Sequence, residues 1–157
     1  MFNPISLLAP LISLAYRLIV QPKLKIVVDD PLDHQLCQNA TRRIRIVNVG
    51  RKMASNVKVM WYQIPEECPP IPLNWTHNIS PMSIPKGKSS LCDFIDLIPL
   101  QEGRCRIYSA STCEYKMWLP QGCTNGEIRV YGDGIDEVYL RVQIVFKGNT
   151  VEIKQVQ

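Results

Sequence analysis

Apolar and charged residues alternate along several short segments of this chain. Ile44 and Ile46 alternate with arginines, Gly50 interrupts the pattern, and Val57 and Val59 resume it seven residues later. A period of two places apolar side chains on one face of a strand and charged side chains on the other. Glycine permits a positive φ where a strand ends. The pattern therefore predicts two strands separated by a basic turn.

The same reading predicts about eight or nine short strands, separated by turns that the chain's twelve prolines favour. Their expected ranges are 23–28, 43–49, 57–64, 89–98, 104–109, 115–119, 127–131, 138–146 and 150–154. Residues 65–75 hold several prolines and are predicted to form an extended connection unsuited to a central strand. No segment after residue 20 has a sustained helical period. These features predict an all-β antiparallel sandwich.

Alternation also predicts which side chains face the core. The expected inward residues are Ile44, Ile46, Val57, Val59, Trp61, Ile128, Val130, Leu140, Val142 and Ile144. In the segment 89–98, Leu91, Asp93, Ile95 and Leu97 are expected on one face and Cys92, Phe94, Asp96 and Ile98 on the other.

The first 21 residues differ in composition from the rest of the 157-residue chain. From Ile5 to Val20 the only charged residue is Arg17, and Pro10 interrupts the apolar run. A free-standing membrane-spanning helix needs about 20 apolar residues, so this run is short for that purpose. We predict an assembly or membrane-anchor segment over 1–21, with a short hydrophobic helix bent or started at Pro10, and a sandwich domain over 22–157. The helix could span a bilayer, lie in its interface or pack on membrane subunits, through Leu7, Leu8, Leu11, Ile12, Leu14, Leu18 and Ile19.

The side of the membrane on which the sandwich would lie is left open by the sequence. Arg17, Lys23 and Lys25 follow the apolar run and favour the cytoplasmic side. Three glycosylation triplets, at Asn39, Asn74 and Asn78, and six cysteines favour the extracellular side. At least one disulfide is expected among the clustered residues Cys92, Cys105, Cys113 and Cys123.

Residue patterns that carry catalysis or bind cofactors are not found in the sequence. It has no G-x-S-x-G, no phosphate-binding glycine loop and no C-x-x-C, and His34 and His77 lie in loop-like segments. We therefore expect a protein that is not an enzyme, with no cofactor and no metal site. The acidic groups 29–33 and 133–137 either form tight turns or hold calcium, and the sequence leaves both open. The net charge of +4 is mild and its basic residues alternate along strands, so no nucleic acid is expected as a partner.

Several short motifs resemble known surface modules. The "NVG", basic turn and "ASNVKV" arrangement resembles the paired strands of immunoglobulin-like adhesion modules of the CARDB type. Together with "PKLKI", "PLNW", "SIPKG" and "VYGDG", it is similar to a loose group of uncharacterised prokaryotic proteins that begin with an apolar segment. The resemblance covers Lys23 to about Gly148, and it implies an immunoglobulin-like fold and no activity.

Two functional hypotheses follow. The first is a non-catalytic, membrane-tethered interaction or structural subunit of a larger membrane or cell-envelope assembly, which binds membrane partners through residues 1–20 and other protein chains through its sandwich. The second is an extracellular glycosylated surface or filament subunit, pilin-like in layout, whose apolar segment packs into neighbouring copies.

Overall fold

The computed structural model describes residues 10, 12–15, 20–28, 41–65, 68–76, 81–98, 104–108, 117–148 and 150–156. Within these ranges the chain forms twelve strands: β1 Leu24–Val28, β2 Thr41–Asn48, β3 Ala54–Ile64, β4 Ile71–Pro72, β5 Asn74–Trp75, β6 Met82–Ile84, β7 Ser89–Ile98, β8 Arg104–Ile107, β9 Trp118–Leu119, β10 Gly122–Asp133, β11 Val138–Lys147 and β12 Thr150–Gln155.

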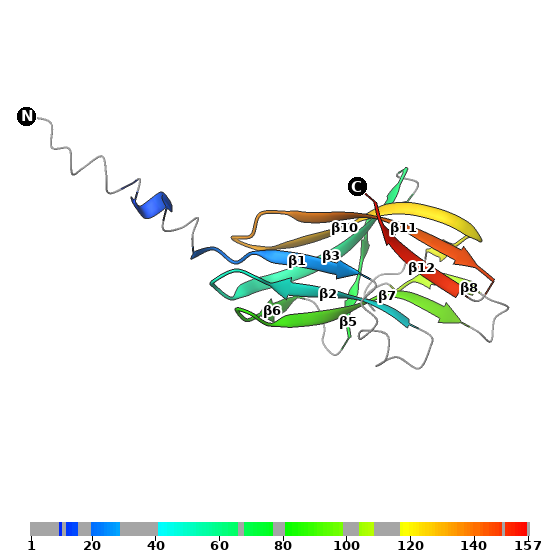
Figure 1. Ribbon diagram of the computed structural model, residues 1–157, viewed down its shortest axis with the longest axis horizontal. Coiled ribbons are helices and arrows are strands. Elements are labelled where there is room, and N and C mark those ends of the chain that lie inside the picture. The colour runs from blue at the N-terminus through cyan, green and yellow to red at the C-terminus, as the bar shows by residue number, and fades with distance from the viewer. Residues whose placement is uncertain are drawn as a thin grey trace, which may run out of the picture.

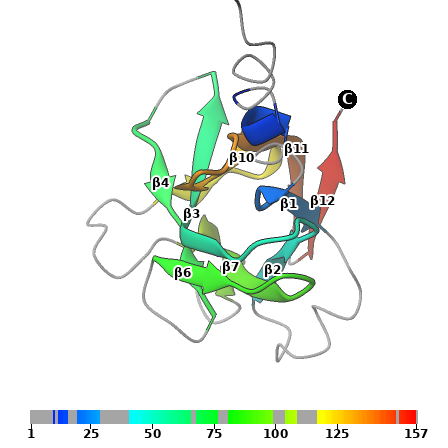
Figure 2. The same ribbon diagram turned by 90° about the vertical axis from the view of Figure 1, so that its left-hand side faces the viewer.

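The strands form two antiparallel sheets, which lie face to face (Figures 1 and 2). The first sheet has the order β1-β2-β7-β8-β9, and β5 also pairs with β7. The second has the order β12-β11-β10-β3-β4, and β6 also pairs with β3. Edge strand β1 contacts β11 and β12 of the opposite sheet, so the two sheets approach each other along that side. The predicted all-β antiparallel architecture is confirmed.

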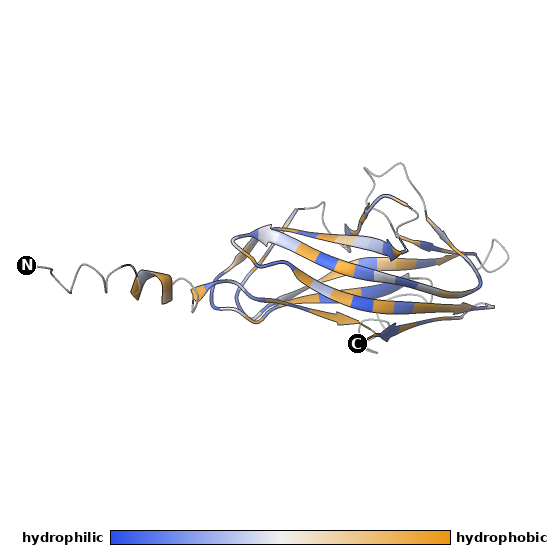
Figure 3. Ribbon diagram, turned by 90° about the horizontal axis from the view of Figure 1, so that it is seen from above, coloured by the Kyte–Doolittle hydropathy of each residue, from blue (hydrophilic) through white to orange (hydrophobic). Residues whose placement is uncertain are grey.

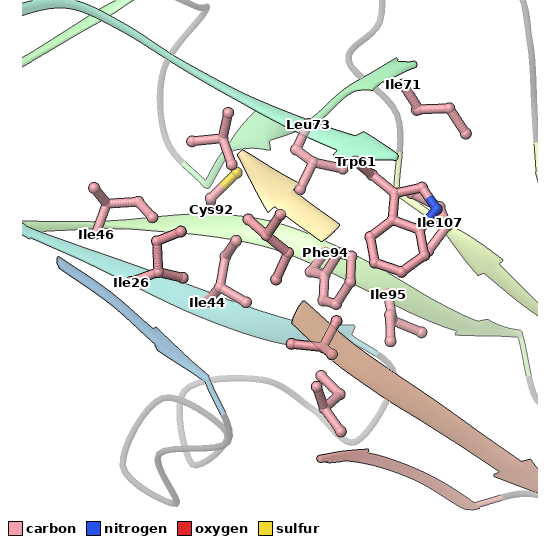
Figure 4. Packing of buried hydrophobic residues seen from close by; sticks show 14 of the residues in the cluster. Ile26, Ile44, Ile46, Trp61, Ile71, Leu73, Cys92, Phe94, Ile95 and Ile107 are labelled. Atoms are coloured by element: carbon pink, nitrogen blue, oxygen red, sulfur yellow. The ribbon is translucent and has the colours of Figure 1, made fainter. Parts of the chain in front are cut away.

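The core lies between the sheets and contains the residues that alternation placed there. Nine of the ten predicted inward side chains are buried, and Leu140 is partly buried against the same cluster. Trp61 of β3 contacts Phe94 of β7 across the sandwich, with ring centroids 5.3 Å apart (Figure 4). Gly126 of β10 faces inward under the Trp61 indole, and a Cβ at this position would overlap the ring. The glycine thus makes room for the largest side chain of the core.

Strand β7 departs from the simple alternation predicted for it. Arg42 and Arg43 of β2 pair with Ile95 and Asp93, so Phe94 is an extra residue in a β-bulge. The bulge reverses the phase of the strand, and Phe94 and Ile95 are therefore both fully buried although they are adjacent. The expected faces are wrong in consequence, because Cys92 and Phe94 from one predicted face point inward together with Ile95 and Leu97 from the other.

The proline-rich segment 65–75 is a crossover that forms short strands. Its β4 pairs with β3 in the second sheet, and its β5 pairs with β7 in the first. Each strand has only two residues, as expected for edge pairing in a segment rich in proline. Strand β10 begins at Gly122, before the predicted start at residue 127, and residues 115–116 of the predicted strand 115–119 lie outside the described ranges.

Candidate interaction surfaces

The chain enters the sandwich through a short linker that is hydrogen-bonded to the turn between β2 and β3. The backbone N–H groups of Val49 and Gly50 donate to the Lys23 carbonyl at 2.8 and 3.2 Å, and that of Arg51 donates to the Gln21 carbonyl at 3.4 Å. These bonds fix the direction in which the chain leaves the sandwich toward the apolar segment.

Glycine is required at position 50 because the backbone of the linker passes close to it. The sequence predicts a positive φ at Gly50, and that expectation is wrong. Its φ lies outside the left-handed region. A Cβ on Gly50 would overlap the Lys23 backbone nitrogen and would lie 2.7 Å from the Gln21 oxygen and 2.8 Å from the Pro22 carbonyl carbon. All three atoms belong to the backbone, which cannot move aside as a flexible side chain can.

Asn48 is fully buried behind this turn and holds it in shape. Its side-chain nitrogen donates to the carbonyls of Lys52 at 2.7 Å and Ile84 at 2.9 Å, and its side-chain oxygen accepts a bond from Gly50 N–H at 3.0 Å. Its backbone carbonyl accepts a bond from Gly87 N–H at 3.0 Å. We call residues 21–23, 48–53 and 85–88 the N-terminal junction.

In the apolar segment beyond the junction, residues 10 and 12–15 are exposed, whereas Val20 is half-buried. Residues 12–15 are helical, Ile12 is 65% exposed and Leu14 is 56% exposed. Figure 3 shows these residues beyond the end of the sandwich, with apolar colouring. Among the described residues, no helix is long and apolar enough to cross a membrane. The other predicted membrane contacts, Leu7, Leu8, Leu11, Leu18 and Ile19, lie outside the described ranges.

A second surface lies on the outward side of the second sheet, on β3, β10 and β11. Glu127 of β10 is in register with Tyr62 of β3 and Arg141 of β11. Its carboxylate accepts hydrogen bonds from Arg141 Nε at 3.0 Å and from Arg129 Nε and Nη2 at 3.0 and 2.8 Å. The bonds from Arg141 and Arg129 hold the pKa of Glu127 below its ordinary value, although burial opposes them.

Tyrosines extend this network. The Arg129 guanidinium carbon lies 4.3 Å from the centroid of the Tyr62 ring, a cation–π contact. The hydroxyl oxygens of Tyr62 and Tyr131 are 2.8 Å apart. Burial, and then the bond to Tyr62, raise the pKa of Tyr131 to about 12. Tyr139, in register with Arg129, is 61% exposed.

We call this outward surface the Tyr–Arg face, and its members are Tyr62, Glu127, Arg129, Tyr131, Tyr139 and Arg141. Its charged groups are already oriented by one another, so a partner would meet guanidiniums and rings that need little ordering. Tyrosine and arginine are the residue types that dominate protein–protein hot spots. This surface is not predicted by the sequence. The outward positions of β10 could be read from alternation, but the register that places Arg141 beside Glu127 could not.

The described cysteines do not form the predicted disulfide with one another. Cys92, Cys105 and Cys123 are free thiols, and Cys113 lies outside the described ranges. Cys92 and Cys105 are buried in the core, whereas Cys123 is exposed. Burial, together with the nearby Asp96 carboxylate, raises the pKa of Cys105 to about 12, and burial likewise raises that of Cys92. These two thiols are therefore packing residues in a protonated state.

Of the three glycosylation triplets, the structure describes only the one at Asn74. Asn74 lies in β5 and is half-buried, not in an open loop, and the Thr76 hydroxyl donates to the Asp93 carboxylate at 2.9 Å. Asn39 and Asn78 lie outside the described ranges, as do His34 and His77.

The described residues contain no group of three or more His, Cys, Asp or Glu side chains that could hold a metal ion. In the acidic loop 133–137, the Asp133 carboxylate instead accepts a hydrogen bond from the Asn56 side chain. Glu137 lies 3.5 Å from Arg129. The other acidic group, 29–33, lies outside the described ranges.

Comparison with known proteins adds no relationship, because the chain matches no family model, no curated protein and no solved structure. The interpretation of both surfaces therefore rests on their own geometry and chemistry.

Proposed function

We propose that this protein is a non-catalytic, membrane-associated subunit that holds a partner protein. The observation that carries the proposal is the exposed apolar pair Ile12 and Leu14 on a segment that is joined to the sandwich through hydrogen-bonded backbone. Covering each large apolar side chain is worth roughly 1.5–3 kcal/mol. Lipid or a membrane subunit would supply that cover for residues 1–20.

The Tyr–Arg face is the surface proposed to contact the partner. It presents exposed Tyr139 in register with Arg129. The Arg129 guanidinium is held by the Glu127 carboxylate and by the Tyr62 ring. The Arg129 guanidinium loses little side-chain entropy on binding, because the network already restricts it. The opposite face of the same sheet is buried in the core, so the Tyr–Arg face is the side that this sheet offers to other chains.

An immunoglobulin-like fold of the CARDB type is also proposed, and strand order supports it. In immunoglobulin domains the first, second and fifth strands share one sheet, and the third, sixth and seventh share the other. Here β1, β2 and β7 are neighbours in one sheet, and β3, β10 and β11 in the other. The short strands β4, β5 and β6 lie between β3 and β7 in sequence, where immunoglobulin domains vary in strand number.

Deleting residues 1–19 tests the proposed attachment and leaves Gln21 in place to bond Arg51. The junction would stay intact, so the shortened chain should be a folded, soluble monomer that no longer sediments with membranes. Circular dichroism, size exclusion and membrane fractionation measure these properties. A shortened chain that unfolds, or that still partitions with membranes, would show that the segment belongs to the folded core or is not the anchor.

The proposed partner surface is tested by Tyr139→Ala, with Val156→Ala as the matched control because Val156 is also exposed, at 43%. Native protein purified in mild detergent should bring a partner with it, and the Tyr139 variant should reduce the amount of that partner. Quantitative mass spectrometry of the purified material provides the measurement. Equal recovery with the two variants would exclude Tyr139 from the contact.

A further inference from the structure

Basic side chains gather at the end of the sandwich from which the apolar segment leaves. Lys23 in the linker, Arg51 and Lys52 in the β2–β3 turn, and Lys86 and Lys88 in the β6–β7 turn are all exposed. Figure 1 shows the linker and both turns at this same end. Hydrogen bonds between them confirm that they are neighbours, because Asn48 bonds to both turns.

Apolar side chains accompany these cations. Val49 is 59% exposed and Met53 is 56% exposed, and both belong to the β2–β3 turn. An open groove of about 300 Å³ lies beside Val49, and Pro22, Ile135 and Val138 also line it, together with Lys23 and Asp136. Exposed apolar residues flanked by Lys and Arg are the composition of surfaces that lie in the headgroup region of a bilayer.

The length of the linker limits the distance between the N-terminal junction and a membrane that covers the apolar segment. Lys23 is three residues from Val20, and an extended chain covers at most about 3.6 Å per residue, so the two residues are at most roughly 11 Å apart. The Debye length at physiological ionic strength is about 8 Å. A membrane that holds residues 1–20 would thus place anionic headgroups at a distance from the junction comparable to the Debye length, where their attraction for lysine and arginine is weakened but not abolished.

Acidic residues at the same end oppose this attraction in part. Asp133 at the end of β10, and Asp136 and Glu137 in the loop that follows it, are exposed. Asp133 accepts a bond from Asn56, and Glu137 pairs with Arg129 at 3.5 Å. The five exposed cations of the junction therefore outnumber the acids, and two of those acids already have polar partners.

We propose that the N-terminal junction is a docking surface for anionic lipid headgroups, an inference that rests on the membrane attachment proposed above. Arg51, Lys52, Lys86 and Lys88 face the phosphates, while Val49 and Met53 enter the interface. The surface would orient the sandwich on the bilayer, whereas the apolar segment alone would only attach it.

Vesicle binding by the full chain tests this docking. The probes are phosphatidylcholine vesicles with and without phosphatidylglycerol, at low and high salt. The variant Lys52→Gln/Lys86→Gln/Lys88→Gln removes three junction charges, and the control Lys58→Gln/Lys147→Gln/Lys154→Gln removes three exposed charges that lie outside the junction. Each lysine near an anionic surface contributes about fivefold, so the junction variant should bind anionic vesicles roughly a hundredfold more weakly than the native chain, and the control much less so.

The two lipid mixtures separate failure of the docking from failure of the attachment. Binding to both mixtures with equal affinity, or equal losses in the junction and control variants, would overturn the docking and leave the attachment standing. A chain that binds neither mixture would overturn both. A second variant, Met53→Asp, should also weaken binding to anionic vesicles, and unchanged binding by it would refute insertion of the β2–β3 turn.

Discussion

Replacing Gly50 with alanine would test whether the linker is fixed against the β2–β3 turn. The new Cβ would overlap the backbone of Lys23 and lie 2.7 Å from the Gln21 oxygen. Because the opposing atoms are backbone, either the turn or the linker must move away. Movement would break the bonds that Val49, Gly50 and Arg51 donate to the linker.

The magnitude follows from those bonds and from the overlap. A net contribution of about 0.5–1.5 kcal/mol applies to each typical hydrogen bond, and the bond at 2.8 Å is the best formed of the three. Overpacking in a tight site costs about 1–3 kcal/mol. If the linker moves away, the cost of the overlap falls while the cost of the broken hydrogen bonds rises, so the two ranges are not simply added. Gly50→Ala should therefore lower the free energy of unfolding by about 2–4 kcal/mol.

Urea unfolding measures this loss, and hydrogen exchange shows where it originates. In the variant, the amides of Val49, Gly50 and Arg51 should exchange much faster than those of the core strands. Gly87→Ala is the control, because Gly87 has a φ of 68° and no atom within 4 Å of its added Cβ. It should cost about 1–2 kcal/mol through backbone strain alone and leave protection of the linker bonds unchanged. Unchanged exchange at Val49–Arg51 in Gly50→Ala would refute a fixed junction.

Three other predictions address the buried polar groups and the thiols. Asn48→Ala removes the side-chain hydrogen bonds to the carbonyls of Lys52 and Ile84 and the bond from the Gly50 amide, and it should lower the free energy of unfolding by about 3 kcal/mol in urea titrations. Glu127 has a pKa below its ordinary 4.5, so its stabilisation is present above that pH and is lost as the pH falls through the lowered value. Glu127→Gln should therefore cost about 1–2 kcal/mol at neutral pH and reduce the loss of stability in acid, which unfolding at a series of pH values would detect. In the folded protein, pulse alkylation followed by mass spectrometry should label Cys123 and spare Cys92 and Cys105 until the chain unfolds; early labelling of the buried pair would contradict their placement.

Alternation predicts the core because each strand has one face exposed to solvent and one face turned toward the core. Ile44, Val59 and Trp61 occupy strands without an irregularity at those positions, and all are buried as predicted. The bulge at Phe94 could not be predicted, since it arises from pairing between β2 and β7. A single extra residue exchanges the faces of everything that follows it.

The candidate surfaces were less accessible to sequence reasoning, because they depend on contacts between distant segments. Glu127 and Arg141 are 14 residues apart and meet only through the register of β10 and β11. Gly50 was identified from the sequence for the wrong reason. The sequence marks it as a turn glycine, whereas its function is to admit the linker, and that linker is recognisable only when the chain is folded.

Strand β3 connects the two proposed surfaces, with an irregularity in its pairing between Ala54 and Val57. It begins at Ala54, directly after the N-terminal junction, and reaches Tyr62 of the Tyr–Arg face while paired with β10 along most of its length. Ten residues separate Lys52 from Tyr62, which at about 3.3 Å per residue is roughly 30 Å. A membrane contact at the junction would therefore hold a partner bound near Tyr62 at no more than about that height above the bilayer. Because a paired strand transmits orientation as well as distance, the junction would also set the direction that the Tyr–Arg face presents.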